Sequence, residues 1–225
     1  MDITYLELPT KDLHAQKEYY SNVLGLPVEL STERLEVKVG STALVFTQAD
    51  ADFDGAYHFA FNIPENQFHA SKEWIASRVP LIKDTEGGDE FVSESWNSQS
   101  IYFKDAVGNI LEFIARHNLK NAVFGEFDSD QILNVSEIGL SSDDVIALAN
   151  ELCVKLDLSV FVQEPNETFT PVGDDNGLFI LPTKDRIWFP NTGVPAKLLP
   201  VKVKVEIQGR QWEVHGFPYS FRLLP

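Results

Sequence analysis

The chain repeats one order of predicted elements, in which a strand is followed by a helix and then by further strands. The first strand is predicted over residues 3–8, where side chains alternate between two faces. Leu6 and Leu8 share one face, and Tyr5 and Glu7 share the other. Because this alternation is typical of a half-buried strand, we expect the leucines to face the core and Tyr5 and Glu7 to face away from it.

The rest of this first unit is a helix and a hairpin. Thr10 or Asp12 can cap the start of the helix, and Gly25 ends it. Residues 35–39 and 43–47 then alternate as two short strands around the turn at residues 40–42.

A second copy of the unit starts at residue 57. Phe59 and Phe61 share one face of its first strand, and His58 lies on the opposite face. A helix over about residues 64–77 and two or three strands follow. The last strand carries Glu112 and is preceded by a Gly- and Asn-containing sequence that favours a tight turn.

A third copy starts near Val135 and has its helix over residues 145–156, capped by Ser141 or Ser142. Strands are predicted around Val160 and over residues 178–181, 187–189 and 201–207. No compact fourth unit is expected after them. The repeats predict a paired βαβββ domain over residues 1–116, a linker over residues 117–131, and a third βαβββ-like unit with a C-terminal extension over residues 132–225.

Charge and composition exclude several classes of partner. The net charge of -16 argues against nucleic acid and anionic membrane surfaces, because both require clustered Lys and Arg. No stretch approaches the roughly 20 apolar residues that cross a bilayer. The N-terminal residues lack a signal sequence, and the single cysteine, Cys153, fits a reducing compartment. We therefore expect a cytoplasmic protein with a small-molecule partner.

Three segments carry a resemblance to a known family. Residues 6–13 (LELPTKDL) with 19–26 (YYSNVLGL), and residues 102–113 (YFKDAVGNILEF), resemble signatures of the vicinal-oxygen-chelate superfamily of glyoxalases, bleomycin resistance proteins and extradiol dioxygenases. Residues 137–144 (EIGLSSDD) match more weakly, and residues 208–225 match nothing. The resemblance implies an α+β fold, in which repeated βαβββ units form cup-shaped mixed sheets with helices on the outer faces and ligands enter the concave side.

The resemblance also implies candidate ligands for a metal. Relatives that bind metal draw ligands from the first strand of each unit and from the last strand of the second, which gives Tyr5, His58 and Glu112 here. His58 and Glu112 suit Zn, Mn, Fe or Ni, but neutral Tyr5 is a poor ligand for a divalent ion. Tyr5 is therefore expected to line a ligand pocket with His58. Glu7 is a candidate third ligand, and Glu112 or Glu7 a candidate general base.

Glu137 occupies the position in the third unit that Tyr5 has in the first, since each lies seven residues before an aspartate, Asp144 or Asp12. One hypothesis is that Glu137 forms an ion pair with Lys202 where a metal otherwise sits. The alternative is that both are exposed residues at a sheet edge, which make no specific pair.

Two functions are consistent with these residues. The first is a glyoxalase- or dioxygenase-like enzyme, a metal-dependent lyase or dioxygenase, that handles a small oxygen-bearing molecule through a divalent metal at His58 and Glu112. The second is a metal-free protein that binds a drug or metabolite in the same cup. In either case the unpaired third unit leaves a sheet edge, so a homodimer is expected.

Overall fold

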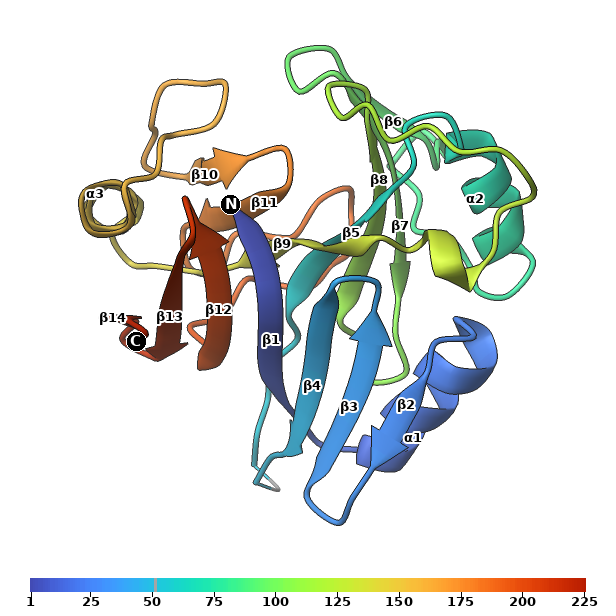
Figure 1. The fold of residues 1–225 in the computed structure, drawn as a ribbon, viewed down its shortest axis with the longest axis horizontal. Coiled ribbons are helices and arrows are strands. Elements are labelled where there is room, and N and C mark those ends of the chain that lie inside the picture. Colours follow the sequence, from blue (N-terminus) through green and yellow to red (C-terminus); the bar gives the residue numbers. More distant parts are fainter. Residues whose placement is uncertain (51) are drawn as a thin grey trace.

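The computed structural model describes residues 1–50 and 52–225 and has the expected α+β architecture (Figure 1). Its helices are α1 (Leu13–Glu18), α2 (Phe68–Ala76), α3 (Val145–Leu156), the π-helical turn η1 (Tyr19–Val23) and the 3-10 turn η2 (Ser129–Gln131). Its strands are β1 (Asp2–Thr10), β2 (Val28–Leu30), β3 (Arg34–Val39), β4 (Thr42–Gln48), β5 (His58–Ile63), β6 (Phe91–Ser93), β7 (Ser98–Lys104), β8 (Ile110–Arg116), β9 (Asn134–Gly139), β10 (Phe169–Asp174), β11 (Gly177–Pro182), β12 (Val201–Ile207), β13 (Arg210–Gly216) and β14 (Ser220–Leu223). None of the described helices is long and apolar enough to cross a membrane.

The strands form two mixed sheets of seven strands each. Sheet A has the order β14-β13-β12-β1-β4-β3-β2, and sheet B has the order β10-β11-β9-β5-β8-β7-β6. Within each of the first two units, the first strand pairs in parallel with the last, β1 with β4 and β5 with β8. The units join through antiparallel strand pairs, β1 with β12 and β5 with β9.

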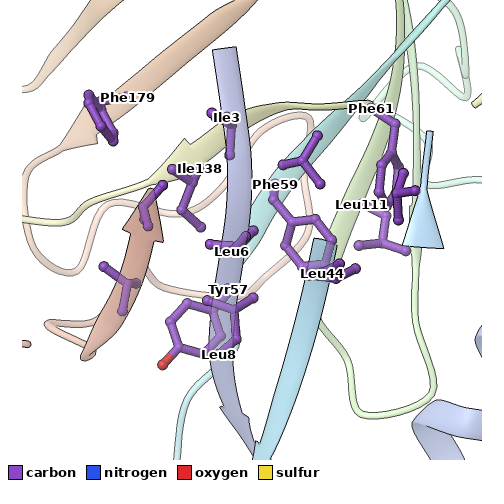
Figure 2. Packing of buried hydrophobic residues seen from close by; sticks show 14 of the residues in the cluster. Ile3, Leu6, Leu8, Leu44, Tyr57, Phe59, Phe61, Leu111, Ile138 and Phe179 are labelled. Atoms are coloured by element: carbon purple, nitrogen blue, oxygen red, sulfur yellow. The ribbon is translucent and has the colours of Figure 1, made fainter. Parts of the chain in front are cut away.

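The main core lies where one face of sheet A packs on one face of sheet B. Ile3, Leu6 and Leu8 of β1 belong to the same buried cluster as Phe59 of β5 and Ile138 of β9 (Figure 2). The predicted alternation is confirmed over residues 6–8 of β1 and 59–63 of β5, where every second side chain enters this cluster. An irregularity in register interrupts it between Ile3 and Leu6 and between Val135 and Ile138. The opposite faces of the two sheets therefore point away from the shared core.

Short-range signals position the helices that flank the sheets. The carboxylate of Asp12 accepts a hydrogen bond from the backbone N–H of Ala15 at 2.8 Å and caps α1. Asp144, and neither of the serines expected in this role, caps α3 through the N–H of Ala147 at 2.9 Å. Each cap satisfies a backbone donor that has no partner within the helix.

A buried carboxylate ties the first unit to the second. Asp105, in the turn between β7 and β8, accepts hydrogen bonds from Nε2 of Gln16 at 2.7 Å and from Nδ2 and the backbone N–H of Asn109 at 2.7 and 2.9 Å. Burial raises the pKa of Asp105 despite these donors. The carboxyl group thus fixes α1 against the turn that leads into β8.

The pairing of the units differs from the expected one. The first and second units were expected to share one cup, but β1 lies in sheet A and β5 in sheet B, where its partner is the first strand of the third unit. The residues beyond 208, which matched nothing, form β13 and β14 and extend sheet A. The division into domains at residues 116 and 132 stays a prediction.

Two predicted strands of the third unit are shorter in the structure. Residues 187–189 make one isolated bridge, between Ile187 and Pro195, and Val160 makes another with Val172. The strand beside β11 is instead β10, which was not expected. In place of a strand, residues 183–200 form an irregular stretch between β11 and β12, which we call the covering segment.

Candidate metal centre

A small residue at the centre of sheet B lets two carboxylates approach each other. Ala60 of β5 lies in register with Glu112 of β8 on one side and with Glu137 of β9 on the other. His58 lies two residues before Ala60 and so shares its face of the strand. Because the Ala60 side chain is a single methyl group, the longer side chains around it can converge above it.

The three converging side chains offer one nitrogen and two carboxylate oxygens. Nε2 of His58 lies 3.6 Å from Oε2 of Glu112 and 4.0 Å from Oε2 of Glu137. The donor atoms of the three residues all lie within 4.8 Å of one another, and all three side chains are buried. Among the described residues, this is the group of His, Cys, Asp or Glu that is close enough to hold a metal ion.

A hydrogen bond to the backbone orients the imidazole ring of His58. Nδ1 of His58 lies 3.2 Å from the backbone carbonyl of Ile110, which can only accept a hydrogen bond. Nδ1 therefore carries the proton, and the lone pair of Nε2 points toward the carboxylates. Burial lowers the pKa of His58 to about 4, so the ring is neutral at physiological pH. A neutral imidazole held in this way is a ready metal ligand.

The two glutamates cannot both carry a free charge in this environment. Burial, and then the nearby Glu137, raise the pKa of Glu112 to about 8. Burial also raises the pKa of Glu137, although the Arg116 guanidinium opposes the shift. Two buried carboxylates that share a site hold a proton between them, and Arg116 places that proton on Glu112.

Arg116 supplies the charge that balances Glu137. It is fully buried, and its NH2 group donates a hydrogen bond to Oε1 of Glu137. The guanidinium faces the rings of Trp96 and Phe161, at 5.6 and 5.7 Å from their centres. It also lies 3.9 Å from a carboxylate oxygen of Asp175. Since Oε1 of Glu137 is held by Arg116, Oε2 is the oxygen left to face His58.

The three side chains form the floor of a pocket of 290 Å³. Six aromatic side chains contribute to its walls. Three of them, Tyr102, Phe91 and Phe189, pack edge to face with ring centres 4.9–5.5 Å apart. Phe189 and Trp188 come from the covering segment, which closes on itself through hydrogen bonds between residues 185–188 and 194–196.

Gly139, the last residue of β9, makes room for the covering segment. A Cβ atom at residue 139 would lie 2.4 Å from the indole ring of Trp188. The same indole packs on the ring of His58, with 4.9 Å between their centres. The missing side chain at residue 139 therefore lets Trp188 cover the histidine.

Comparisons with solved structures give the fold. A proposed dioxygenase from Bacillus subtilis is 14% identical, with a TM-score of 0.59, and the match covers 96% of this chain and 81% of that one. A glyoxalase I mutant from Zea mays is also 14% identical, with a TM-score of 0.50 over 81% of this chain and 66% of that one. The chain has the vicinal-oxygen-chelate fold.

Other solved structures match about half of the chain. FosX, a fosfomycin resistance protein from Listeria monocytogenes solved with Mn(II), is 20% identical over 49% of this chain and 86% of that one, with a TM-score of 0.39. Neither a protein-family model nor a curated protein matches the sequence.

Within this vicinal-oxygen-chelate fold, two of the four residues predicted for the site come together. His58 and Glu112 are neighbours, as expected. Tyr5 and Glu7 face away from the core, also as expected, but in sheet A, where the Tyr5 hydroxyl donates a hydrogen bond to Glu7. The two positions were assigned to this cup on the assumption that β1 pairs with β5, and that pairing does not form.

The hypothesised ion pair between Glu137 and Lys202 does not form, and the alternative that both are exposed at a sheet edge is wrong as well, because Glu137 is buried, Lys202 is partly buried and both lie on interior strands. Glu137 bonds to Arg116 in sheet B, whereas Lys202 lies in sheet A, in register with Glu7 and 5.8 Å from the ring of Tyr5. Glu137 is instead the third donor beside His58. Its match to the first-strand position of the first unit was the signal that could have identified it.

The donor set fits a divalent metal. One imidazole and two carboxylates suit Zn, Mn, Fe or Ni. Ligands at about 2.1 Å from a common ion are themselves roughly 3–3.5 Å apart, so the observed separations require only small side-chain movements. The backbone carbonyl behind His58 and the guanidinium behind Glu137 are second partners of the kind that orient metal ligands.

Proposed function

We propose that the chain is a metal-dependent enzyme that acts on a small oxygen-bearing molecule in the pocket of sheet B. The observation that carries the proposal is the convergence of His58, Glu112 and Glu137 on the pocket floor. The similarity of fold to a proposed dioxygenase and to a glyoxalase I mutant supports it as an analogy.

The side chains have separate roles in this proposal. A divalent metal bound by His58, Glu112 and Glu137 supplies Lewis acidity toward substrate oxygens. Glu112 gives up its proton when it becomes a ligand, while Arg116 keeps Glu137 ionised. Trp188 and the other aromatic walls exclude water, which strengthens the electrostatic interactions of the floor.

Metal titration of protein treated with a chelator tests the proposal. One divalent ion per chain is expected to bind, and His58→Ala is expected to weaken binding at least about 100-fold. His69→Ala is the matched control, because His69 is exposed on α2. Absence of saturable binding of Zn²⁺, Mn²⁺, Fe²⁺ and Ni²⁺, or equal binding by both variants, would contradict the proposal.

The metal-free alternative has one specific observation in its favour. With Glu112 protonated and Glu137 paired with Arg116, the floor is close to electrically neutral without an ion. A binding protein would therefore retain a stable pocket after metal removal. Ligand binding that is unchanged by chelation, together with failed metal titration, favours this second function.

A further inference from the structure

The mouth of the pocket carries an unusual distribution of charge. Of the described residues that line the pocket, Arg186 alone is a permanent cation, and the acidic ones are the floor residues Glu112 and Glu137. The chain has 34 acidic residues against 18 basic ones, so an arginine that forms no ion pair is not the expected surface pattern. Arg186 is exposed whereas the two glutamates are buried, which places it on the solvent side of the pocket.

Arg186 has spare hydrogen-bonding capacity. NH1 donates to the backbone carbonyl of Thr168 at 3.1 Å, and the guanidinium lies 4.7 Å from the centre of the Phe169 ring. No carboxylate of the described residues lies within 4.0 Å of it. A guanidinium has five N–H donors in a fixed fork that matches carboxylate and phosphate oxygens, and most of these donors are unused here.

The surroundings of this cation are apolar. Ile187 and Phe189, which also line the pocket, are 48% and 54% exposed beside it. Phe189 continues into the aromatic wall formed with Phe91 and Tyr102. At 290 Å³ the pocket lies just below the range of about 300–1,000 Å³ for small-molecule sites, which suits a body of about one ring.

We infer that Arg186 is a specificity-determining residue that selects ligands with a ring-sized apolar body and an anionic oxygen group, a carboxylate or a phosphate, bound at the mouth. The inference deepens the proposed function, on which it rests for the choice of pocket. It assigns the substrate an anionic end at Arg186, opposite the end that reaches the floor. It requires no particular metal.

Binding of simple aromatic probes to chelator-treated protein tests the inference. Benzoate and phenyl phosphate are the anionic probes, and benzamide is the neutral probe of similar size. At least one anion is expected to bind about tenfold more tightly than benzamide, the effect of one charge-assisted contact. Comparison of benzoate with phenyl phosphate identifies the preferred anion.

Variants of the cation complete the experiment. Arg186→Gln is expected to remove the preference for the anion and leave benzamide binding unchanged, whereas Arg186→Lys retains part of it. Lys184→Gln is the matched control, since Lys184 is an exposed cation two residues away that does not line the pocket. Equal binding of charged and neutral probes, no anion binding up to about 10 mM, or the same preference in Arg186→Gln overturns the inference.

The two proposals fail in distinguishable ways. The anion preference is measured without metal, so a failed metal titration contradicts the metal-dependent enzyme alone. An anion preference that persists in Arg186→Gln, with normal Mn²⁺ binding by that variant, contradicts only the role of Arg186.

Discussion

Metal binding at the floor of the pocket is expected to release a measurable number of protons, which depends on the pH. Burial and the nearby Glu137 raise the pKa of Glu112 to about 8, so this carboxyl group is mostly protonated at pH 7 and mostly ionised at pH 9. Burial lowers the pKa of His58 to about 4, so the ring is already neutral and contributes no proton. Since a ligand carboxylate must be ionised, metal binding at pH 7 is expected to displace about one proton, and at pH 9 a much smaller fraction.

The same linkage gives the pH dependence of affinity. Below pH 8 the proton competes with the metal, so affinity is expected to fall about tenfold for each unit by which the pH is lowered. Calorimetric titration in two buffers that differ in ionisation enthalpy measures the number of protons released. Glu112→Gln is the control, because it lacks the titrating carboxyl group and any proton release that remains has another source.

Proton release by wild type and by Glu112→Gln, compared at pH 7 and pH 9, tests the role of Glu112. If the difference in proton release between wild type and Glu112→Gln is near zero at pH 7, or is the same at pH 7 and pH 9, Glu112 either holds no proton in the folded protein or is not a ligand.

Two further predictions concern stability. Gly139→Ala places a methyl group against Trp188 and is expected to destabilise the fold by ~1–3 kcal/mol and to expose the indole, seen as a lower denaturant midpoint and a red-shifted fluorescence spectrum. Trp188→Phe should suppress the loss in the double variant, and additive losses would argue against the contact. Asp105→Ala leaves buried donors of Gln16 and Asn109 without an acceptor and is expected to cost ~2–4 kcal/mol in urea unfolding; a loss below about 0.5 kcal/mol would contradict the tie between the units.

Alternation along single strands was enough to predict which side chains share a face. His58 and Glu112 were assigned to the same cavity because each alternates with core residues such as Phe59 and Phe113, and the structure brings them within 3.6 Å of each other. That inference needs only the local geometry of a strand and the parallel pairing of first and last strands within one unit.

The neighbour of each unit could not be predicted in the same way. The strands that begin with residues 3, 58 and 135 all carry an apolar face and a polar face, so the pattern fits several pairings of units equally well. The choice of β9 as the partner of β5 depends on long-range packing. Because β5 pairs with β9 and not with β1, the third residue of the site is Glu137 and not Tyr5.

The conformation of the covering segment could not be predicted for a different reason. Its residues have no regular period, and the position of Trp188 is decided by a glycine nearly fifty residues earlier in the chain. Such a contact joins an irregular segment to a strand end, where neither helical nor strand alternation applies.

The two sheets turn their polar faces in opposite directions from one shared core. At the positions that correspond in register to His58, Glu112 and Glu137, sheet A carries Tyr5, Val45 and Lys202. Among the described residues, the outer face of sheet B thus carries the candidate metal centre, and the corresponding positions of sheet A do not repeat it. An affinity tether or a label attached to the outer face of sheet A therefore leaves the pocket of sheet B open to ligands.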